Sequence, residues 1–138
     1  MGKSHHSLCY VSSAKESLTN IDLEHLFFVN NRNNSELDIS GILVYNNGNF
    51  LQILEGEKHT IDNLFLKISK DSRHNNIIEL INAPTFERIF KDYESGFVVV
   101  EDVKKLKQLE NYLDWIKEAE LLNVDKVIRI IENFIGKK

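Results

Sequence analysis

Two short apolar runs joined by an Asn-Asn-Gly-Asn sequence at residues 46–49 constrain the fold of this chain more than any other feature. The first run covers residues 39–45, and the second covers residues 50–55. Asn-Gly between two apolar runs is a strong hairpin signal, because both residues tolerate the positive φ that a tight turn requires. The sequence therefore predicts two antiparallel strands in the middle of the chain.

Three more short apolar runs predict the rest of a sheet. They lie at residues 7–12, 77–81 and 96–100. Pro84 predicts a turn between the last two of them, because proline lacks the amide hydrogen that a strand interior uses. Together with the central hairpin, these runs give five strands.

Two stretches between the strands carry apolar residues at helical spacing. The first begins at Thr19 or Asn20, which can cap a helix, and ends near residues 33–34. The second begins at residues 59–60 and ends near residues 71–74. The order of strands and helices predicts an α+β, ferredoxin-like fold: a mixed five-stranded sheet with two helices on one face.

Two amphipathic helices are predicted after residue 103. Their apolar stripes consist of Val103, Leu106, Leu109, Leu113 and Ile116, and of Val124, Val127, Ile128, Ile131 and Phe134. The sheet face that the first two helices leave uncovered can receive these stripes, and an interface with another molecule is the alternative. We therefore expect one domain at residues 1–102 and a helical extension at residues 103–138, packed on the sheet or at an oligomer interface.

Charge and cysteine content exclude several classes of function. The chain has 17 Lys and Arg against 21 Asp and Glu, a formal net charge of −4, which argues against binding to nucleic acid or to an anionic membrane surface. Its apolar runs are far shorter than the roughly 20 residues that cross a bilayer. The single cysteine, Cys9, and the absence of a zinc-type Cys and His spacing fit a cytoplasmic protein without a metal site.

Two polar residues stand where the sequence predicts a core. Gln52 shares one face of its strand with Phe50 and Leu54, and Tyr10 lies in the middle of the first strand. An unpaired buried amide costs about 1 to 3 kcal/mol, so Gln52 needs a polar neighbour or a bound ligand; backbone or water partners are the alternative. The pair predicts a polar floor between the two helices. Asn34 is a weaker candidate, because the chain contains 15 asparagines.

No nucleophile has a recognisable supporting base. Cys9 and Ser12 lie in an apolar strand, and the sequence contains no Gly-x-Ser-x-Gly, no His-Glu-x-x-His and no glycine-rich phosphate loop. The sequence therefore predicts no enzyme. A small hydrolase on a ferredoxin-like scaffold is an alternative function.

Five segments form a more specific pattern. They lie at residues 8–14, 33–45, 48–56, 71–74 and 90–97. The block Phe-Leu-Gln-x-Leu-Glu-Gly follows a hairpin and precedes a helix, and Tyr-x-Ser-x-Ala stands in the first strand. In these segments the chain resembles a BLUF domain, the blue-light sensor that uses FAD. Its two terminal helices resemble those of short members that carry no enzymatic output domain.

The resemblance implies an FAD chromophore between the first two helices. Tyr10 matches the photochemical tyrosine of the family, Gln52 its switching glutamine, and Asn34 the asparagine at the polar edge of the flavin ring. Light is then expected to drive electron and proton transfer from Tyr10 to the flavin and to rearrange Gln52, which shifts the absorption to the red. The resemblance also implies that the signal passes to a protein partner.

Other positions match further flavin contacts of the family. They are Asn33, Phe50, Ile68, Asp71, Arg73 and His74. The resemblance implies that Phe50 and Ile68 are apolar walls and that Arg73 pairs with the phosphates.

The fifth strand departs from the family pattern. Where many members carry Trp and, two residues on, Met, this chain has Tyr93 and Ser95. We expect both to influence signal relay, since Ser95 can donate a hydrogen bond to Gln52 where a thioether would only pack. The departure leaves a flavin-free interaction module as a second alternative, and the terminal helices favour a homo-oligomer.

Overall fold

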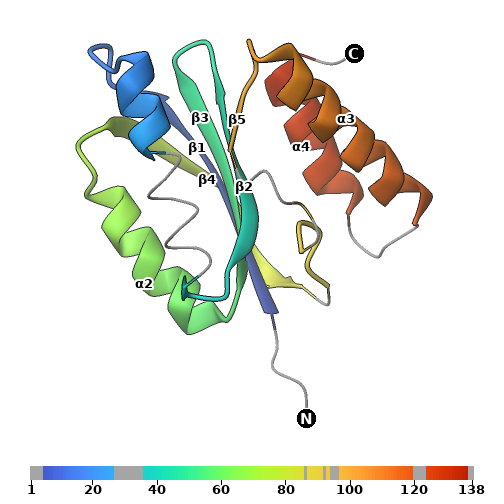
Figure 1. Ribbon diagram of the computed structural model, residues 1–138. Coiled ribbons are helices and arrows are strands. Elements are labelled where there is room, and N and C mark those ends of the chain that lie inside the picture. Colours follow the sequence, from blue (N-terminus) through green and yellow to red (C-terminus); the bar gives the residue numbers. More distant parts are fainter. Residues whose placement is uncertain are drawn as a thin grey trace.

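Five strands form one mixed sheet in the order β4-β1-β3-β2-β5 in the computed structural model (Figure 1). The strands are β1 (His5–Ala14), β2 (Ser40–Asn46), β3 (Asn49–Gly56), β4 (His74–Thr85) and β5 (Phe97–Val99). Neighbouring strands are antiparallel except β2 and β5, which are parallel. The structure describes residues 5–26, 36–85, 87–91, 93, 97–119 and 124–136. The mixed five-stranded sheet predicted from the sequence is confirmed.

The central hairpin joins β2 to β3 as predicted. Asn46 pairs with Asn49, and between them Asn47 and Gly48 have positive φ angles of 53° and 81°. This is the backbone region in which Asn and Gly are least strained. The hairpin therefore fixes which side chains of β3 face each side of the sheet.

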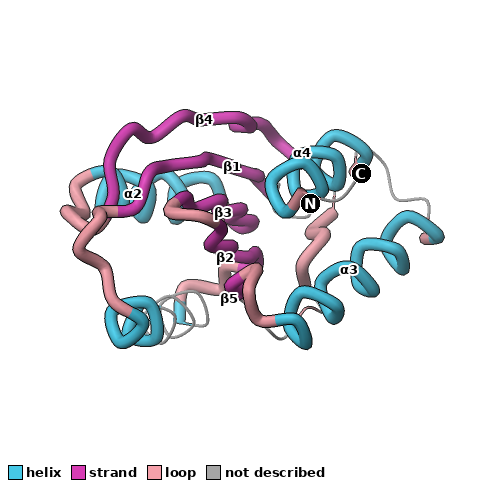
Figure 2. The backbone as a smooth tube through the Cα atoms, turned by 90° about the horizontal axis from the view of Figure 1, so that it is seen from above, coloured by secondary structure: helices cyan, strands magenta, loops and turns pink. Residues whose placement is uncertain are grey.

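Helices cover both faces of the sheet (Figures 1 and 2). On one side lie α2 (Lys58–Ser69) and a helical segment at residues 20–26, and on the other lie α3 (Val103–Glu118) and α4 (Asp125–Ile135). Thr19 caps the helical segment: its Oγ1 accepts a hydrogen bond from the Asp22 amide, and Asp22 Oδ2 accepts one from the Thr19 amide. The predicted continuation of this helix to residues 33–34 lies outside the described residues.

The largest cluster of buried apolar side chains in the described part of the chain lies under α3 and α4. The sheet contributes Cys9, Ile42, Val44, Leu51, Ile53 and Val98, and the helices contribute Leu109, Leu113, Ile116, Val127, Ile128, Ile131 and Ile135. The two terminal helices therefore pack on the sheet face opposite α2. Among the described residues, no helix has the length and apolar character to span a membrane.

The prediction of a turn at Pro84 is wrong. Pro84 lies inside β4, opposite His6 of β1. β4 is the first strand in the sheet order, so only β1 pairs with it. At a sheet edge, a residue whose amide would point away from the neighbour can lack its hydrogen without loss of a ladder bond. The strand therefore continues through the proline to Thr85.

Candidate functional site

Tyr10 and Gln52 lie directly opposite each other on the neighbouring strands β1 and β3. The Tyr10 hydroxyl donates a hydrogen bond to Gln52 Oε1 at 2.5 Å. Each of the two residues is only 3% exposed. A buried phenol and a buried amide both need polar partners, and this bond supplies one to each. The structure therefore brings together the two residues from which the sequence predicts a polar floor.

Two apolar clusters flank this pair on the same face of the sheet. The cluster beside α2 contains Leu8, Tyr10, Ile39, Leu54 and Ile61. The second cluster contains Leu23, Leu43, Phe50 and Phe97. Side chains alternate along a strand, so Gln52 points to the same side as Phe50 and Leu54. Because these two neighbours belong to different clusters, the polar pair lies between two separate apolar clusters in the part of the chain that the structure describes.

His74, the first residue of β4, connects the end of α2 to the floor of the site. Its Nε2 lies 2.7 Å from the carbonyl oxygen of Ile68, and its Nδ1 lies 2.7 Å from the Ser12 hydroxyl. A carbonyl only accepts, so Nε2 donates the first bond. The imidazole meets the rings of Tyr10 and Phe50 edge-on, with centroid distances of 6.0 Å and 6.4 Å. The half-buried side chain of Ile68 packs on the cluster beside α2.

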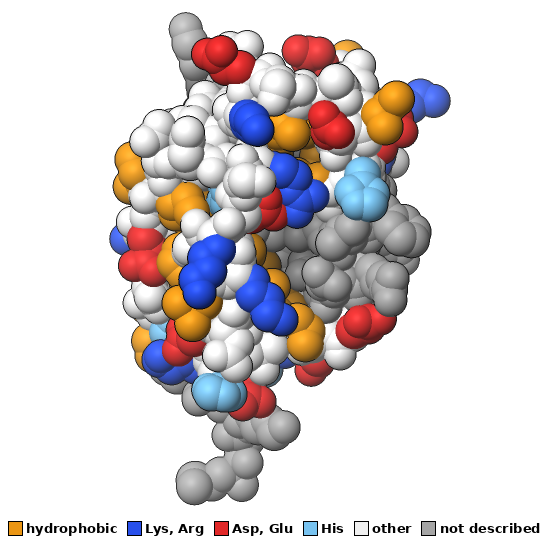
Figure 3. Space-filling view, turned by 90° about the vertical axis from the view of Figure 1, so that its left-hand side faces the viewer, with side chains coloured by type: hydrophobic (Ala, Val, Ile, Leu, Met, Phe, Trp, Pro, Cys, Tyr) orange, Lys and Arg blue, Asp and Glu red, His pale blue; other side chains and the backbone are white. Residues whose placement is uncertain are grey.

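Asp71 and Arg73 form an ion pair in the turn after α2. Arg73 Nε donates to Asp71 Oδ1 at 2.9 Å, and Nη2 also contacts the carboxylate. The hydrogen bonds from Arg73 lower the pKa of Asp71. The described surface on this side of the molecule intersperses acidic, basic and apolar side chains (Figure 3). To bind a phosphate, Arg73 would have to share or leave this carboxylate.

Tyr10 and its neighbour Cys9 on β1 both keep their hydrogens at neutral pH. Burial raises the pKa of the Tyr10 phenol, and the negative charge of Asp71 adds to the shift. Tyr10 is therefore a donor toward Gln52. Burial also raises the pKa of the Cys9 thiol to about 12, and Cys9 faces the cluster under α3 and α4. A thiol in this setting is not a reactive nucleophile.

Three predicted site residues lie outside the described residues. They are Asn33, Asn34 and Ser95. Their roles toward the flavin and in signal relay stay predictions.

Tyr93 lies in the cluster on the α3 and α4 side of the sheet. Its ring packs against Tyr112 of α3, with centroids 4.9 Å apart, and meets Phe90 at 6.1 Å. The structure therefore places Tyr93 on the face opposite Tyr10 and Gln52. Its part in signal relay stays a prediction.

Glu55 of β3 is a buried polar residue that the sequence analysis did not single out. Its side chain is fully buried. Oε2 accepts a hydrogen bond from the Ile89 amide at 2.7 Å, and Oε1 accepts bonds from the Phe90 amide at 2.8 Å and the Ser40 hydroxyl at 3.1 Å. Strand alternation was the available signal, because it places Glu55 on the same face as the buried Ile53.

Comparison with known proteins identifies the family. Residues 6–96 match the BLUF family model, described as sensors of blue-light using FAD. The chain belongs to the BLUF family. The matched part of this BLUF chain includes Tyr10, Gln52 and the Asp71–Arg73 ion pair, and it ends before β5. The resemblance stated from the sequence is confirmed.

Relatives and solved structures agree with this assignment. A photoactivated adenylate cyclase subunit beta of Euglena longa is 39% identical over 84 residues, which are 61% of this chain and 10% of that protein. The Klebsiella pneumoniae BlrP1 calcium and cy-diGMP complex has a TM-score of 0.78 at 27% identity and is matched over 96% of this chain and 34% of its own. BlrB, a BLUF protein in its dark state, has a TM-score of 0.72 at 26% identity, over 99% of this chain and 98% of its own.

These comparisons confirm the ferredoxin-like α+β fold and the membership of a family of blue-light sensors. This BLUF chain spans about a tenth of the length of the Euglena cyclase subunits that it matches. A BLUF domain is a sensor module, and its family is one of flavin proteins.

Proposed function

We propose that this BLUF domain binds FAD at the Tyr10–Gln52 pair and responds to blue light. The observation that carries the proposal is the buried hydrogen bond between these two side chains, which lie between the two apolar clusters that the described residues form on this face. A flavin has an apolar ring end and a polar ring edge, so it needs both kinds of surface. The residues present fit this requirement: Leu54 and Phe50 are apolar neighbours, and Arg73 offers a cation for phosphate.

A bound flavin supplies absorption of blue light and, once excited, an oxidant strong enough to take an electron from a phenol. Tyr10 is the phenol, and its hydroxyl hydrogen already points at Gln52 Oε1. The raised pKa keeps the hydrogen on Tyr10 Oη as long as the phenol is not oxidised. Loss of an electron makes the phenol strongly acidic, so the hydrogen can then leave. The Gln52 amide has two donor hydrogens and one acceptor oxygen. It can therefore accept from Tyr10 in one arrangement and donate to a flavin carbonyl in another.

We further propose that the chain has no catalytic activity of its own and passes its signal to a protein partner in the cytoplasm. The match covers only 10% of the cyclase relative, so most of that protein lies outside the aligned residues. Helix α3 carries two exposed apolar residues, Val103 and Trp115, at 77% and 54% exposure. Of these two, Trp115 is of a residue type that is enriched in protein interfaces, so it can contact a partner or a second copy of this chain, which supports a homo-oligomer.

Absorption spectroscopy tests the proposal. The purified chain is expected to be yellow, to shift its flavin absorption to longer wavelength under blue light, and to return in the dark. Release of the chromophore and its chromatography against FAD and FMN identify the flavin, which matters because one BlrP1 structure was solved with FMN. A colourless protein that does not take up added FAD would contradict the proposal.

A further inference from the structure

The buried carboxylate of Glu55 ties the loop between β4 and β5 to β3. Its two oxygens accept the amide hydrogens of two consecutive loop residues, Ile89 and Phe90. Both loop residues are buried, at 6% and 1% exposure. Two bonds from one rigid carboxylate to adjacent amides fix the direction of the loop backbone as well as its distance from the strand.

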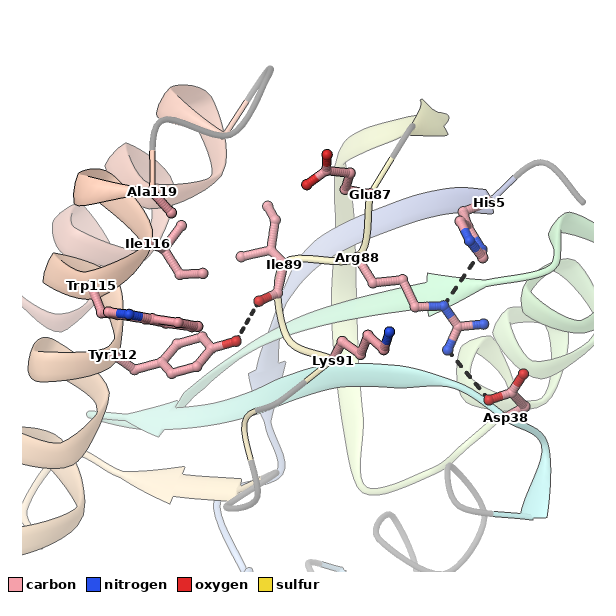
Figure 4. A pocket seen from close by; sticks show the side chains of 10 residues that line it. All are labelled: His5, Asp38, Glu87, Arg88, Ile89, Lys91, Tyr112, Trp115, Ile116 and Ala119. Atoms are coloured by element: carbon pink, nitrogen blue, oxygen red, sulfur yellow. Dashed lines mark hydrogen bonds and ion pairs between the residues drawn. The ribbon is translucent and has the colours of Figure 1, made fainter. Parts of the chain in front are cut away.

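The same loop is tied on its other side to α3. The Tyr112 hydroxyl donates a hydrogen bond to the Ile89 carbonyl oxygen at 2.5 Å (Figure 4). The Tyr112 ring also stacks on Phe90, with centroids 5.9 Å apart and planes at 23°. Ile89 and Phe90 are therefore held between β3 and α3 by polar bonds on both sides.

This loop and α3 form the two walls of a pocket of about 690 Å³. Arg88 and Lys91 line one wall, and Tyr112, Trp115 and Ile116 line the other (Figure 4). Arg88 is further positioned by Asp38, whose carboxylate lies 3.5 Å away. A shift of the loop relative to α3 would change the shape of this pocket, so a change inside the sheet would reach the surface here.

We propose that Glu55 is a positioning residue that couples the strand of Gln52 to helix α3, by holding the Ile89–Phe90 backbone against Tyr112. This inference rests on the proposed light response at Gln52. β3 carries Gln52 on one face and Glu55 on the other, so displacement of this strand moves the carboxylate. The loop follows because both carboxylate oxygens are bonded to it.

A purely apolar core would fill the space of Glu55 at lower cost. Burial raises the pKa of Glu55 by more than its hydrogen bonds lower it, so the pKa is raised overall. Replacing buried charged groups by apolar ones is often neutral or stabilising. An apolar side chain, however, has no acceptor for the two loop amides. The carboxylate therefore supplies a connection that packing alone does not.

Hydrogen exchange tests the coupling. The full chain with bound flavin is measured by mass spectrometry in the dark and under blue light, and the absorbance of the same sample is recorded. Two regions are followed: residues 88–91, whose amides include the two bonded to Glu55, and residues 103–118 of α3. In the unchanged protein we expect a red shift together with a severalfold light-dependent change of exchange in both regions.

Two variants separate the coupling from the photochemistry. Glu55→Gln keeps the shape but places an NH₂ group against a loop amide; we expect a normal red shift, faster dark exchange at residues 88–91 and no light effect in α3. Tyr112→Phe keeps the stacked ring and loses the bond to Ile89. We expect it to retain the light effect at residues 88–91 and to lose most of that in α3. Tyr112→Phe also tests the coupling if Glu55→Gln does not fold.

Ser40→Ala is the matched control. It removes a hydroxyl of β2 that donates a hydrogen bond to Glu55, and it leaves both bonds from the loop in place. We expect it to keep both light effects. If either Glu55→Gln or Tyr112→Phe retains the full light effect in α3, the coupling is wrong. A red shift without any light effect at residues 88–91 in the unchanged protein contradicts the coupling alone. Absence of the red shift contradicts the proposed function and, with it, the coupling.

Discussion

The two faces of the sheet are packed in different ways. Under α3 and α4, strands and helices share one continuous apolar cluster. On the α2 side, the described residues form two smaller clusters, and the hydrogen-bonded pair of Tyr10 and Gln52 lies between them. One face therefore has the packing of a stable core, whereas the other has the mixed apolar and polar surface of a ligand site. The difference indicates that stability and light response can be changed separately.

The largest effect is expected at the polar pair. Tyr10→Phe removes the phenol hydroxyl, and Gln52→Ala removes its acceptor, so each variant should bind flavin and lose the normal red shift completely. The measurement is the light-minus-dark absorption spectrum, with circular dichroism as the check on folding. Tyr45→Phe is the control, since it removes the same atom from a half-buried tyrosine in the second cluster of this face. A full red shift in Tyr10→Phe would contradict the assignment of the light response to the polar pair on the α2 face.

The continuous cluster should dominate stability. Leu113 of α3 is fully buried, and Leu113→Ala leaves a cavity that costs about 2 to 5 kcal/mol in the free energy of unfolding. Urea denaturation measures this loss, and the folded fraction should keep its red shift. Val103→Ala, at an exposed position of the same helix, should change the free energy of unfolding by no more than about 0.5 kcal/mol. Equal losses of unfolding free energy in Leu113→Ala and Val103→Ala would contradict the dominant role of the continuous cluster in stability.

Carboxylates on the two faces should respond to pH with opposite sign. Arg73 holds the pKa of Asp71 below its ordinary value of 3.8, so the stabilisation from Asp71 is present above that value and is lost as the pH falls through the folded pKa. Burial raises the pKa of Glu55 above 4.5. Its contribution is therefore present below 4.5 and is lost as the pH rises through the folded pKa.

Unfolding free energies measured from pH 3 to pH 8 check this sign. Asp71→Asn should flatten the loss of stability on the acid side, by less than about 1 kcal/mol because the ion pair is partly exposed. Glu55→Gln should reduce the loss of stability that occurs as the pH rises through the folded pKa of Glu55. If both variants changed the pH dependence of stability on the same side, the opposite pKa shifts of Asp71 and Glu55 would be contradicted.

The smallest effect is expected at Tyr93. This residue packs on α3, on the face away from the polar pair, so Tyr93→Phe should leave the red shift intact. The dark-recovery rate is the second quantity to record, because the relay assigned to this position would act on the lifetime of the light state. A variant that binds flavin and shows no shift would place Tyr93 in the photochemistry itself.

Local patterns predicted most of the fold. The Asn47-Gly48 turn follows from the φ angles that a hairpin requires, and strand alternation placed Tyr10 and Gln52 in the predicted core. That these two side chains stand opposite each other depends on the register between β1 and β3, which lie far apart in the sequence. Alternation within one strand carries no information about that register.

The remaining features depend on tertiary context. Pro84 was predicted to end a strand because proline lacks an amide hydrogen, but the position of β4 at the sheet edge makes that hydrogen unnecessary. Two partners of Glu55, the amides of Ile89 and Phe90, lie in a loop that meets β3 only after the chain has passed through α2 and β4. No spacing along the sequence predicts such a contact.

The register of β1 on β3 has a consequence for affinity. Because the strand register sets Tyr10 opposite Gln52 and a hydrogen bond joins their side chains, neither side chain has to be ordered when a chromophore enters. This conformational entropy is lost during folding rather than on binding. A slip of β1 by a single residue would turn Tyr10 to the opposite face. The distance between Tyr10 and Gln52, on which the proposed light response depends, is therefore set by the backbone pairing of β1 and β3 before a flavin binds.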